Sequence, residues 1–457
     1  MRGTASWMLG GVVLLGLTGC ETVEVISDGY RDMTPHEAYL QGLHDAGLAT
    51  TALSQDWIME SGRALSDPLE MTLPFAEEGY FTPEDPMAVG YRFSVERGQV
   101  VTISLATDAV ETGRIFFDLL RAADDPENPP RPVNADTTDI GFVYEPFRDG
   151  DFIVRIQPEL LRGGAYELRV SLDPALAFPV FGRGPAAAQS RWGAPRDGGR
   201  RSHEGIDIFA PRGTPAIASL PGRVTRANVT AIGGKVVWLR DERHNRNIYY
   251  AHLDSQVVAA GQMVEIGDTL GFVGNTGNAI TTPPHLHFGI YYRGEGAVDP
   301  YPFVQPVRTS MAELDVDRDA WGEWRRVSDD GIRLRAGPSR NADVSMELER
   351  YTPVRVLGGS GDWYRVRLPD GTVGYMAARL TESLEEPIGL ENVSQASEAM
   401  ALPEVDAPRV AGLAMGAELA LLGRFAGYSL IQTDAGVFGW VQDALSRAAP
   451  EPSPDGA

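Results

Sequence analysis

Alternating apolar and polar positions first become regular after residue 67. The pattern runs through Tyr91–Val95 and Val100–Leu105, and it returns after glycine-containing turns in Phe152–Ile156 and Tyr166–Val170. Because side chains alternate between the two faces of a strand, such stretches predict strands with one buried face. Short strands at this spacing, separated by turns, predict a β-sandwich over residues 68–175.

A second β-rich region is an internal repeat at a constant offset of 65 residues. Val354 and Val356 match Leu419 and Leu421, and Gly374-Tyr-Met376 matches Gly439-Trp-Val441, without a gap. Short alternating strands with glycine turns predict a small β-barrel in each unit, at residues 320–382 and 386–446. The tail, residues 447–457, is rich in proline and acidic residues and is expected to be disordered.

Three aromatic residues of this repeat could have either of two roles. Trp363, Tyr364 and Trp440 could stack on sugars or peptides, or they could fill the small cores. Core filling is the commoner fate of such residues. Ile332–Ser339 and Gly361–Val366 of the first unit resemble bacterial Src-homology-3-like domains, which often bind cell wall. The second unit has lost the arginine motif and is a degenerate copy.

The first twenty residues have the pattern of an export signal. Arg2 is followed by an apolar run from Trp7 to Leu17 and then by small residues up to Cys20. The run is too short for a membrane-spanning helix. Cys20 is the single cysteine, so no intramolecular disulfide is possible.

Leu17-Thr-Gly-Cys20 also resembles the lipobox of bacterial lipoproteins. The resemblance implies lipidation of Cys20 and a membrane-anchored protein that faces the periplasm. Glu21, rather than aspartate, follows the cysteine, which favours the outer membrane. A plain signal peptide with an incidental cysteine is the alternative.

Residues 21–67 read as a partly helical tether. Thr34 is a candidate N-cap, and Pro35 begins a run of good helix formers. His36 and His44 have no neighbours at metal-ligand spacing, so both are predicted to be solvent-exposed. The β-sandwich that follows is similar to pre-peptidase domains of secreted bacterial enzymes, although a spacer without a ligand is an equal alternative.

The composition narrows the range of possible functions. The formal net charge is -23, with a pI near 4.7, which argues against nucleic-acid binding. Hydrophobic residues make up 43% of the chain, enough for several cores. Together with the strand pattern, this predicts a mainly β, multidomain protein.

Candidate chemistry is concentrated between residues 203 and 287, where five of the seven histidines lie. His203-Glu-Gly-Ile-Asp207, Tyr250-Ala-His252-Leu253 and His285-Leu-His287 form three compact motifs. Imidazole and carboxylate ligands suit Zn²⁺, and a catalytic site needs three protein ligands plus an open position. His285 and His287 lie on a predicted strand and therefore share one face. Gly205 favours a turn and a strand, rather than a helix, for the first motif.

These motifs resemble lysostaphin-type zinc peptidases, which are peptidoglycan endopeptidases. The resemblance extends to flanking segments of the predicted domain at residues 176–303, namely Arg191–Arg196, Gly213–Ala218, Ala260–Gln262, Gly271–Gly277 and Pro284–Gly289. One departure is the segment from Asp241 to Arg246, in which His244 is predicted to be exposed.

The resemblance implies an antiparallel β domain that binds one Zn²⁺ through His203, Asp207 and His287. It also implies that His252 and His285 are unligated catalytic residues. Zinc would activate a water and polarise the scissile carbonyl. One free histidine would act as the general base, while the other would stabilise the intermediate or protonate the leaving amine. Which histidine has which role stays open.

The sequence thus predicts a zinc metalloendopeptidase that remodels the cell wall by cutting peptide cross-links of peptidoglycan. The alternative is a non-catalytic lipoprotein scaffold that activates a cell-wall amidase. Loss of any ligand would favour the scaffold, and all three ligands are present. The expected partners are stem peptides of peptidoglycan, the membrane through the lipid anchor, and an amidase or regulator; nucleic acid is not expected.

Overall fold

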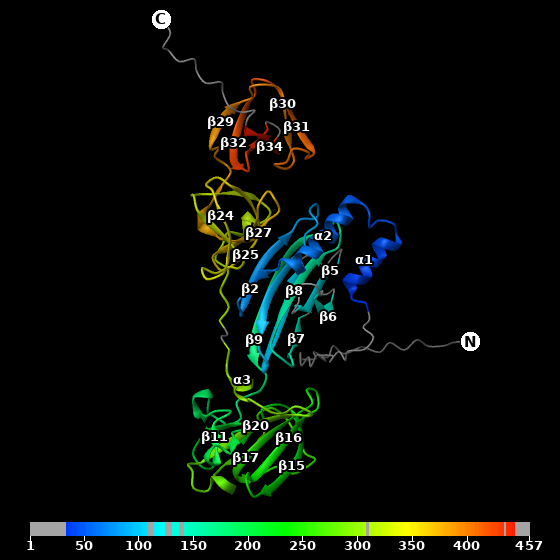
Figure 1. The fold of residues 1–457 in the computed structure, drawn as a ribbon. Coiled ribbons are helices and arrows are strands. Elements are labelled where there is room, and N and C mark those ends of the chain that lie inside the picture. Colours follow the sequence, from blue (N-terminus) through cyan, green and yellow to red (C-terminus); the bar gives the residue numbers. More distant parts are fainter. Residues whose placement is uncertain are drawn as a thin grey trace, which may run out of the picture.

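The structure is a computed structural model that describes residues 33–107, 114–123, 130–136, 141–307, 310–433 and 436–443. The predicted signal peptide with Cys20 and the predicted tail lie outside these residues. Figure 1 shows four bodies in a row: a green domain at one end, a blue and cyan sandwich, and the two repeat units in yellow and orange. Within the described part, no helix is long and apolar enough to cross a membrane.

Two helices begin the described chain, α1 (Pro35–Asp45) and α2 (Ala52–Ser66). The hydroxyl of Thr34 accepts a hydrogen bond from the Glu37 amide, and the Glu37 carboxylate accepts one from the Thr34 amide. This reciprocal capping box confirms the helix start that the sequence predicts.

The predicted exposure of His36 is wrong, whereas His44 is exposed as predicted. His36 is stacked on Trp57 at 4.8 Å and hydrogen-bonded to the side chain of Gln157 at 2.8 Å. Burial lowers the pKa of His36 to about 4. Sequence reasoning failed here because α1 and α2 pack on the sandwich instead of extending into solvent.

The sandwich consists of two sheets around one apolar core, and most of its large side chains are fully buried. The first sheet has the order β1 (Leu69–Glu70), β3 (Val89–Val95), β8 (Gly150–Pro158), β5 (Ile115–Arg121) and β6 (Arg131–Asp136). The second sheet contains β2 (Phe75–Phe81), β9 (Gly164–Pro174), β4 (Gln99–Thr107) and β7 (Phe142–Tyr144). The alternating segments found in the sequence all lie in these strands.

The second sheet of the sandwich continues into the first repeat unit. The strands of that unit are β22 (Trp324–Val327), β23 (Ile332–Arg335), β24 (Val344–Leu348), β25 (Pro353–Ser360), β26 (Trp363–Arg367), β27 (Val373–Ala377) and β28 (Thr381–Ser383). β2 pairs with β25 in the register Glu78↔Gly359 and Gly79↔Gly358. A Cβ atom on Gly358 would lie 2.6 Å from the Glu78 carbonyl oxygen, so glycine permits this close approach.

The second repeat unit contains β29 (Gly389–Asn392), β30 (Ser397–Met400), β31 (Arg409–Leu413), β32 (Glu418–Phe425), β33 (Tyr428–Gln432) and β34 (Phe438–Gln442). Each of its strands has a counterpart among β22–β27, displaced by the offset seen in the sequence. Tyr364 and Trp440 are each 3% exposed, which confirms core filling for these two residues. Trp363 is half-buried and packs against the sandwich core.

The green domain holds the histidine motifs and is called the histidine domain below. Its main sheet contains β10 (Ala188–Ser190), β13 (Ile206–Phe209), β20 (His285–Tyr292), β17 (Arg246–Gln256), β16 (Gly234–Asp241), β15 (Gly222–Thr230) and β18 (Met263–Val264), in that order. The remaining elements are β11 (Pro195–Arg196), β12 (Arg201–Ser202), β14 (Pro215–Ile217), β19 (Thr269–Val273), β21 (Gly296–Val298) and α3 (Tyr301–Val304). Figure 1 shows the chain running from α3 back along the sandwich to the first repeat unit.

Charged side chains join the sandwich to the histidine domain. Arg97 donates two hydrogen bonds to Glu295, at 2.6 and 2.8 Å. Arg246, whose side chain is 2% exposed, pairs with Glu145 across the junction. The predicted exposure of His244 is wrong, because Nε2 of this residue lies 3.2 Å from Glu145 and its side chain is 17% exposed. The hairpin segment from Asp241 to Arg246, where the sequence departs from lysostaphin-type peptidases, thus contributes an interdomain contact.

Candidate metal centre

Three of the predicted site residues come together on two neighbouring strands. Asp207 on β13 is the direct antiparallel partner of His287 on β20. His203 precedes β13 in a turn after β12, which confirms the predicted turn and strand. A short loop with a bend at Gly205 therefore brings His203 next to Asp207, and the separation of four residues does not reflect a helix face.

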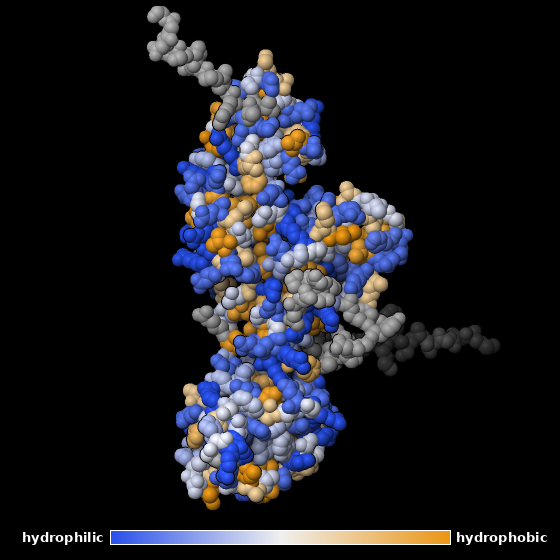
Figure 2. Space-filling view, viewed as in Figure 1, coloured by the Kyte–Doolittle hydropathy of each residue, from blue (hydrophilic) through white to orange (hydrophobic). Residues whose placement is uncertain are grey.

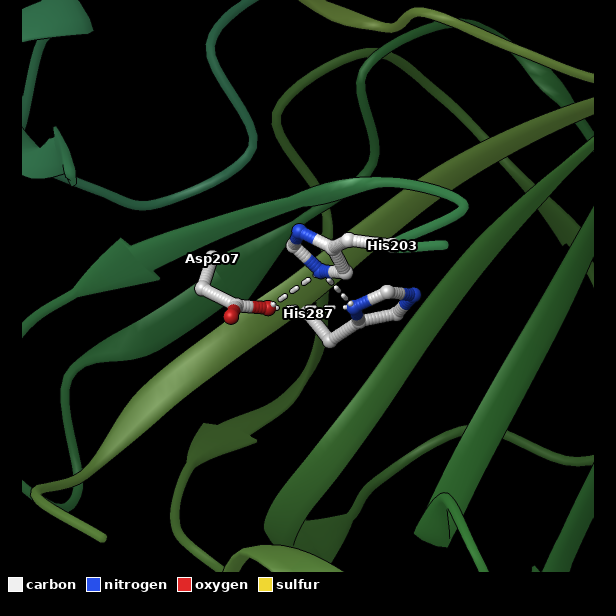
Figure 3. A group of neighbouring side chains, drawn as sticks. All are labelled: His203, Asp207 and His287. Atoms are coloured by element: carbon white, nitrogen blue, oxygen red, sulfur yellow. Dashed lines mark hydrogen bonds and ion pairs between the residues drawn. The ribbon is translucent and has the colours of Figure 1, made fainter. Parts of the chain in front are cut away.

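The donor atoms of these residues converge on one point. Nε2 of His203 lies 2.9 Å from Oδ1 of Asp207 and 2.9 Å from Nδ1 of His287. Nδ1 of His287 lies 3.0 Å from the same Asp207 oxygen. Figure 3 shows the two imidazoles and the carboxylate directed toward one another.

Hydrogen bonds behind the donors fix their orientation. Nδ1–H of His203 donates to the Arg191 carbonyl at 2.9 Å, which leaves Nε2 as an acceptor that faces the cluster. Arg196 donates to Oδ2 of Asp207 at 2.6 Å, so only Oδ1 of the carboxylate faces the two histidines. Arg196 also donates to Ser190 on β10. Outer partners of this kind typically orient metal ligands.

Two further histidines flank the cluster. Nδ1–H of His252 donates to the Thr276 carbonyl, and Nδ1–H of His285 donates to the Pro283 carbonyl, at 2.9 and 2.8 Å. In both side chains Nε2 is thereby left as an acceptor. The two rings are 5.1 Å apart, and His285 Nε2 lies 3.9 Å from Oδ1 of Asp207.

The backbone of His252 is held in an uncommon conformation. Its φ is +61°, at a register shift in the pairing of β16 with β17. The His252 amide donates to the Gly233 carbonyl at 2.8 Å, which stabilises this bulge. Bulges of this kind redirect a side chain, and here the imidazole turns toward His285.

Burial and hydrogen bonding shift the pKa values of the cluster in the direction that suits metal binding. Burial raises the pKa of Asp207, but the close contacts of its carboxylate with His203 and His287 outweigh burial, so the pKa is well below its ordinary value. Burial lowers the pKa of His287 and lowers that of His252 to about 4. Neutral imidazoles and an ionised carboxylate are the forms that bind a metal.

The donor set fits a zinc ion. His203, Asp207 and His287 each offer one ligand atom, and these atoms lie within 4.8 Å of one another. Three lone-pair donors this close repel one another unless a cation or protons lie between them. Two imidazoles and one carboxylate form a three-ligand set typical of catalytic zinc.

A groove with a volume of about 1060 Å³ surrounds the cluster. Its wall beyond His287 is aromatic: Trp238 and Tyr249 have ring centroids 4.4 Å apart, and Trp238 and Tyr291 are 5.3 Å apart. Sequence reasoning missed this wall and gave Arg196 no role. Trp238 and Tyr249 lie at equal distances from the turn of one hairpin, which was a usable signal that they face each other.

Tyr250, considered above as a possible orienting residue, instead faces the core. It is fully buried, and its hydroxyl donates to the side chain of Ser219 at 3.0 Å. The alternation of strand β17 thus separates Tyr249 in the groove from Tyr250 in the core.

Together, the β domain and its three-donor cluster beside two unligated histidines define a candidate metallohydrolase. Comparison with known families assigns two segments of the chain. Residues 201–300 match the model of Peptidase family M23, and residues 330–382 match that of the bacterial SH3 domain. These two segments of the chain are therefore similar to an M23 peptidase domain and to a bacterial SH3 domain.

Named proteins from other organisms are similar to part of the chain. The L-Ala--D-Glu endopeptidase of Bacillus subtilis is 39% identical over 140 residues, which cover 28% of this chain and 43% of that protein. The peptidoglycan DD-endopeptidase ShyC of Vibrio cholerae is 35% identical over 22% of each chain. Lysostaphin of Staphylococcus staphylolyticus is 32% identical over 36% of this chain and 41% of its own. The chain thus spans less than half the length of each of these relatives.

Proposed function

We propose that this protein is a zinc metalloendopeptidase that hydrolyses peptide cross-links of bacterial peptidoglycan. The observation that supports this most directly is the convergence of His203, Asp207 and His287 beside two unligated histidines in one open groove. Two of the similar proteins are endopeptidases by name, and one of these is a peptidoglycan DD-endopeptidase.

The residues divide the chemistry between them. His203, Asp207 and His287 would hold Zn²⁺, which, when bound, supplies a Lewis acid that polarises a carbonyl and lowers the pKa of water. His252 and His285 keep Nε2 unprotonated and directed into the groove, so either can accept the proton of an attacking water. The protonated histidine can then return that proton to the leaving amine as the peptide bond breaks.

Two features of the site favour this catalytic role over a scaffold that activates an amidase. All three ligands are present with their outer partners in place, and both unligated histidines are held in one tautomer. Ligand-free scaffolds have no need of these bonds. Every residue that lines the groove lies between residues 190 and 291, so no other described module covers it.

Localisation forms a separate part of the proposal. Lipidation of Cys20 after removal of the signal peptide would anchor the chain to a membrane and orient it toward the periplasm, with the outer membrane favoured. Metabolic labelling with a fatty acid, compared between the natural chain and Cys20→Ala, tests this proposal. Equal labelling of both would contradict it.

Digestion of purified peptidoglycan by residues 21–457 tests the activity. Released muropeptides are identified by mass, with zinc, with a chelator, and with the His285→Ala variant. We expect cross-linked dimers to disappear only with the zinc-loaded natural sequence. Intact cross-links despite one bound zinc per chain would contradict the peptidase and favour the amidase-activating scaffold.

A further inference from the structure

The wall of the groove continues along one face of the main sheet of the histidine domain. Trp238 on β16 pairs with Tyr249 on β17, and the next position on the same face pairs Arg240 with Asn247. Because side chains two residues apart share a face, the aromatic wall leads directly to Arg240. Core residues of the domain occupy the opposite face of these strands.

Three arginines meet at this end of the sheet face. Arg223 on β15 is the direct cross-strand partner of Arg240, and Arg226 is the partner of Trp238. Arg223 and Arg226 are exposed, and Arg240 is half-buried. Arg223 and Arg240 also line a second cavity, with a volume of about 500 Å³, together with Glu242 and with Glu145 and Asp241, both of which pair with Arg246. Arg240 donates to the side chain of Asn245, and Arg223 to the Gly261 carbonyl at 3.4 Å.

The charge balance of these arginines is unusual for this chain. Like charges directly opposite each other on neighbouring strands are destabilising. Among the described residues, no carboxylate lies within 4.0 Å of the guanidinium of Arg223, Arg226 or Arg240. The whole chain carries a net charge of -23, so a local excess of positive charge does not follow from composition. An anionic ligand would relieve the repulsion.

The three arginines lie within reach of a peptide bound at the candidate metal centre. His287 on β20 pairs with Ala251 on β17, and Arg240 on β16 pairs with Asn247 on β17. Arg240 is therefore two strands away from His287 and four residues farther along the sheet. Strand spacings make this on the order of 15 Å, which an extended peptide of about five residues spans. The only carboxylates that line the described groove are Asp207, a ligand candidate, and Glu204.

We propose that Arg223, Arg226 and Arg240 form a subsite for a carboxylate of the peptide substrate, about five residues from the scissile bond. The proposal rests on the proposed function, since wall peptides contain acidic residues such as glutamate and diaminopimelate. The aromatic wall of Trp238, Tyr249 and Tyr291 would support the intervening chain. Substrates with the free acid would be preferred over their carboxamides.

The test uses two synthetic cross-linked stem peptides that differ only in having free carboxylates or carboxamides. Cleavage by zinc-loaded residues 21–457 is measured for the natural sequence, for Arg240→Gln and for Arg223→Gln/Arg226→Gln. Arg340→Gln, an exposed site in the first repeat unit, is the control with the same change in charge. Zinc content and circular dichroism establish that each variant is folded.

For the natural sequence we expect a KM about three- to tenfold lower for the free acid than for the amide, with similar kcat. Arg240→Gln and Arg223→Gln/Arg226→Gln should lose this preference, whereas Arg340→Gln should keep it. The preference should also weaken as ionic strength rises. An equal KM for acid and amide would refute the subsite, as would a preference that survives in both arginine variants. Neither result would contradict the proposed peptidase activity.

If the proposed peptidase activity is wrong, the same experiment gives a distinguishable result. If the natural sequence cleaves neither peptide, calorimetric binding of the two peptides still decides the subsite. Tighter binding of the free acid, lost in Arg240→Gln and in Arg223→Gln/Arg226→Gln, would support the subsite. Equal binding of acid and amide would overturn it.

Discussion

Replacing Glu77 with glutamine should destabilise the sandwich and the first repeat unit together. Glu77 on β2 is fully buried, and its carboxylate accepts from Nε of Arg365 at 2.9 Å and from the Tyr166 hydroxyl at 3.0 Å. The hydroxyls of Tyr91 and Tyr375 donate to the same carboxylate. The side chain of Arg365 is 1% exposed and comes from β26, on the other side of the continuous sheet.

The magnitude follows from the buried charge that the substitution leaves behind. A glutamine has nearly the volume of glutamate but cannot neutralise Arg365. Removing one partner of a buried ion pair typically costs about 3–5 kcal/mol. At about 2–4 °C per kcal/mol for a unit of this size, the melting temperature should fall by roughly 10 °C.

Chemical denaturation of the full chain, followed by near-ultraviolet circular dichroism, measures this loss. The neighbouring Glu78 is the matched control, because its side chain is 28% exposed and that of its partner Arg318 is 58% exposed, so Glu78→Gln should cost much less. Replacing both buried partners, Glu77→Leu with Arg365→Met, should recover much of the stability. A loss below about 1 kcal/mol in Glu77→Gln would refute the claim that this pair joins the two modules.

Three further predictions concern other parts of the molecule. The folded pKa of His36 is about 4, below the unfolded value near 6.5, so its contribution to stability is fully present above pH 6.5 and is lost as pH falls toward 4. Urea denaturation should show a loss on the order of 3 kcal/mol across this window that is smaller in His36→Gln; identical pH profiles would contradict this. His287→Ala should weaken zinc binding by more than about 100-fold in chelator competition, and His44→Ala, at an exposed site, should not. Glu145→Gln should leave zinc content unchanged but speed limited proteolysis between the sandwich and the histidine domain, because Arg246 loses its partner across the junction; an unchanged rate would show that the remaining contacts suffice.

The junction also bears on how the modules could control one another. Glu145 of the sandwich contacts the hairpin end of β16 and β17, and Arg97 contacts Glu295 in the turn between β20 and β21. The candidate metal centre lies farther along β20, at His287. The sandwich therefore contacts the histidine domain, but none of its residues lines the groove. Any control exerted through the described modules would act through this junction, not by occlusion.

Local sequence determined most of the secondary structure and the composition of the metal centre. Period-two alternation located the sandwich strands, and the repeat located two units whose strands correspond one to one. The resemblance of three motifs to lysostaphin-type zinc peptidases predicted His203, Asp207 and His287 as ligands, whereas spacing alone left the choice between His285 and His287 open. Tyr364 and Trp440 were likewise placed in cores, as small aromatic-containing domains require.

Only the tertiary structure decided which surfaces meet. His36 and His244 look exposed in sequence, because no local pattern reveals that α1 packs on the sandwich or that Glu145 reaches across to the hairpin. Glu77 and Arg365 pair although the entire histidine domain lies between them in the sequence. The alignment of the three arginines with the aromatic wall depends on strand order and register. Such contacts join residues distant in the chain, so their energies are set by the packing of complete sheets, whereas strand periodicity and ligand spacing are properties of a few consecutive residues.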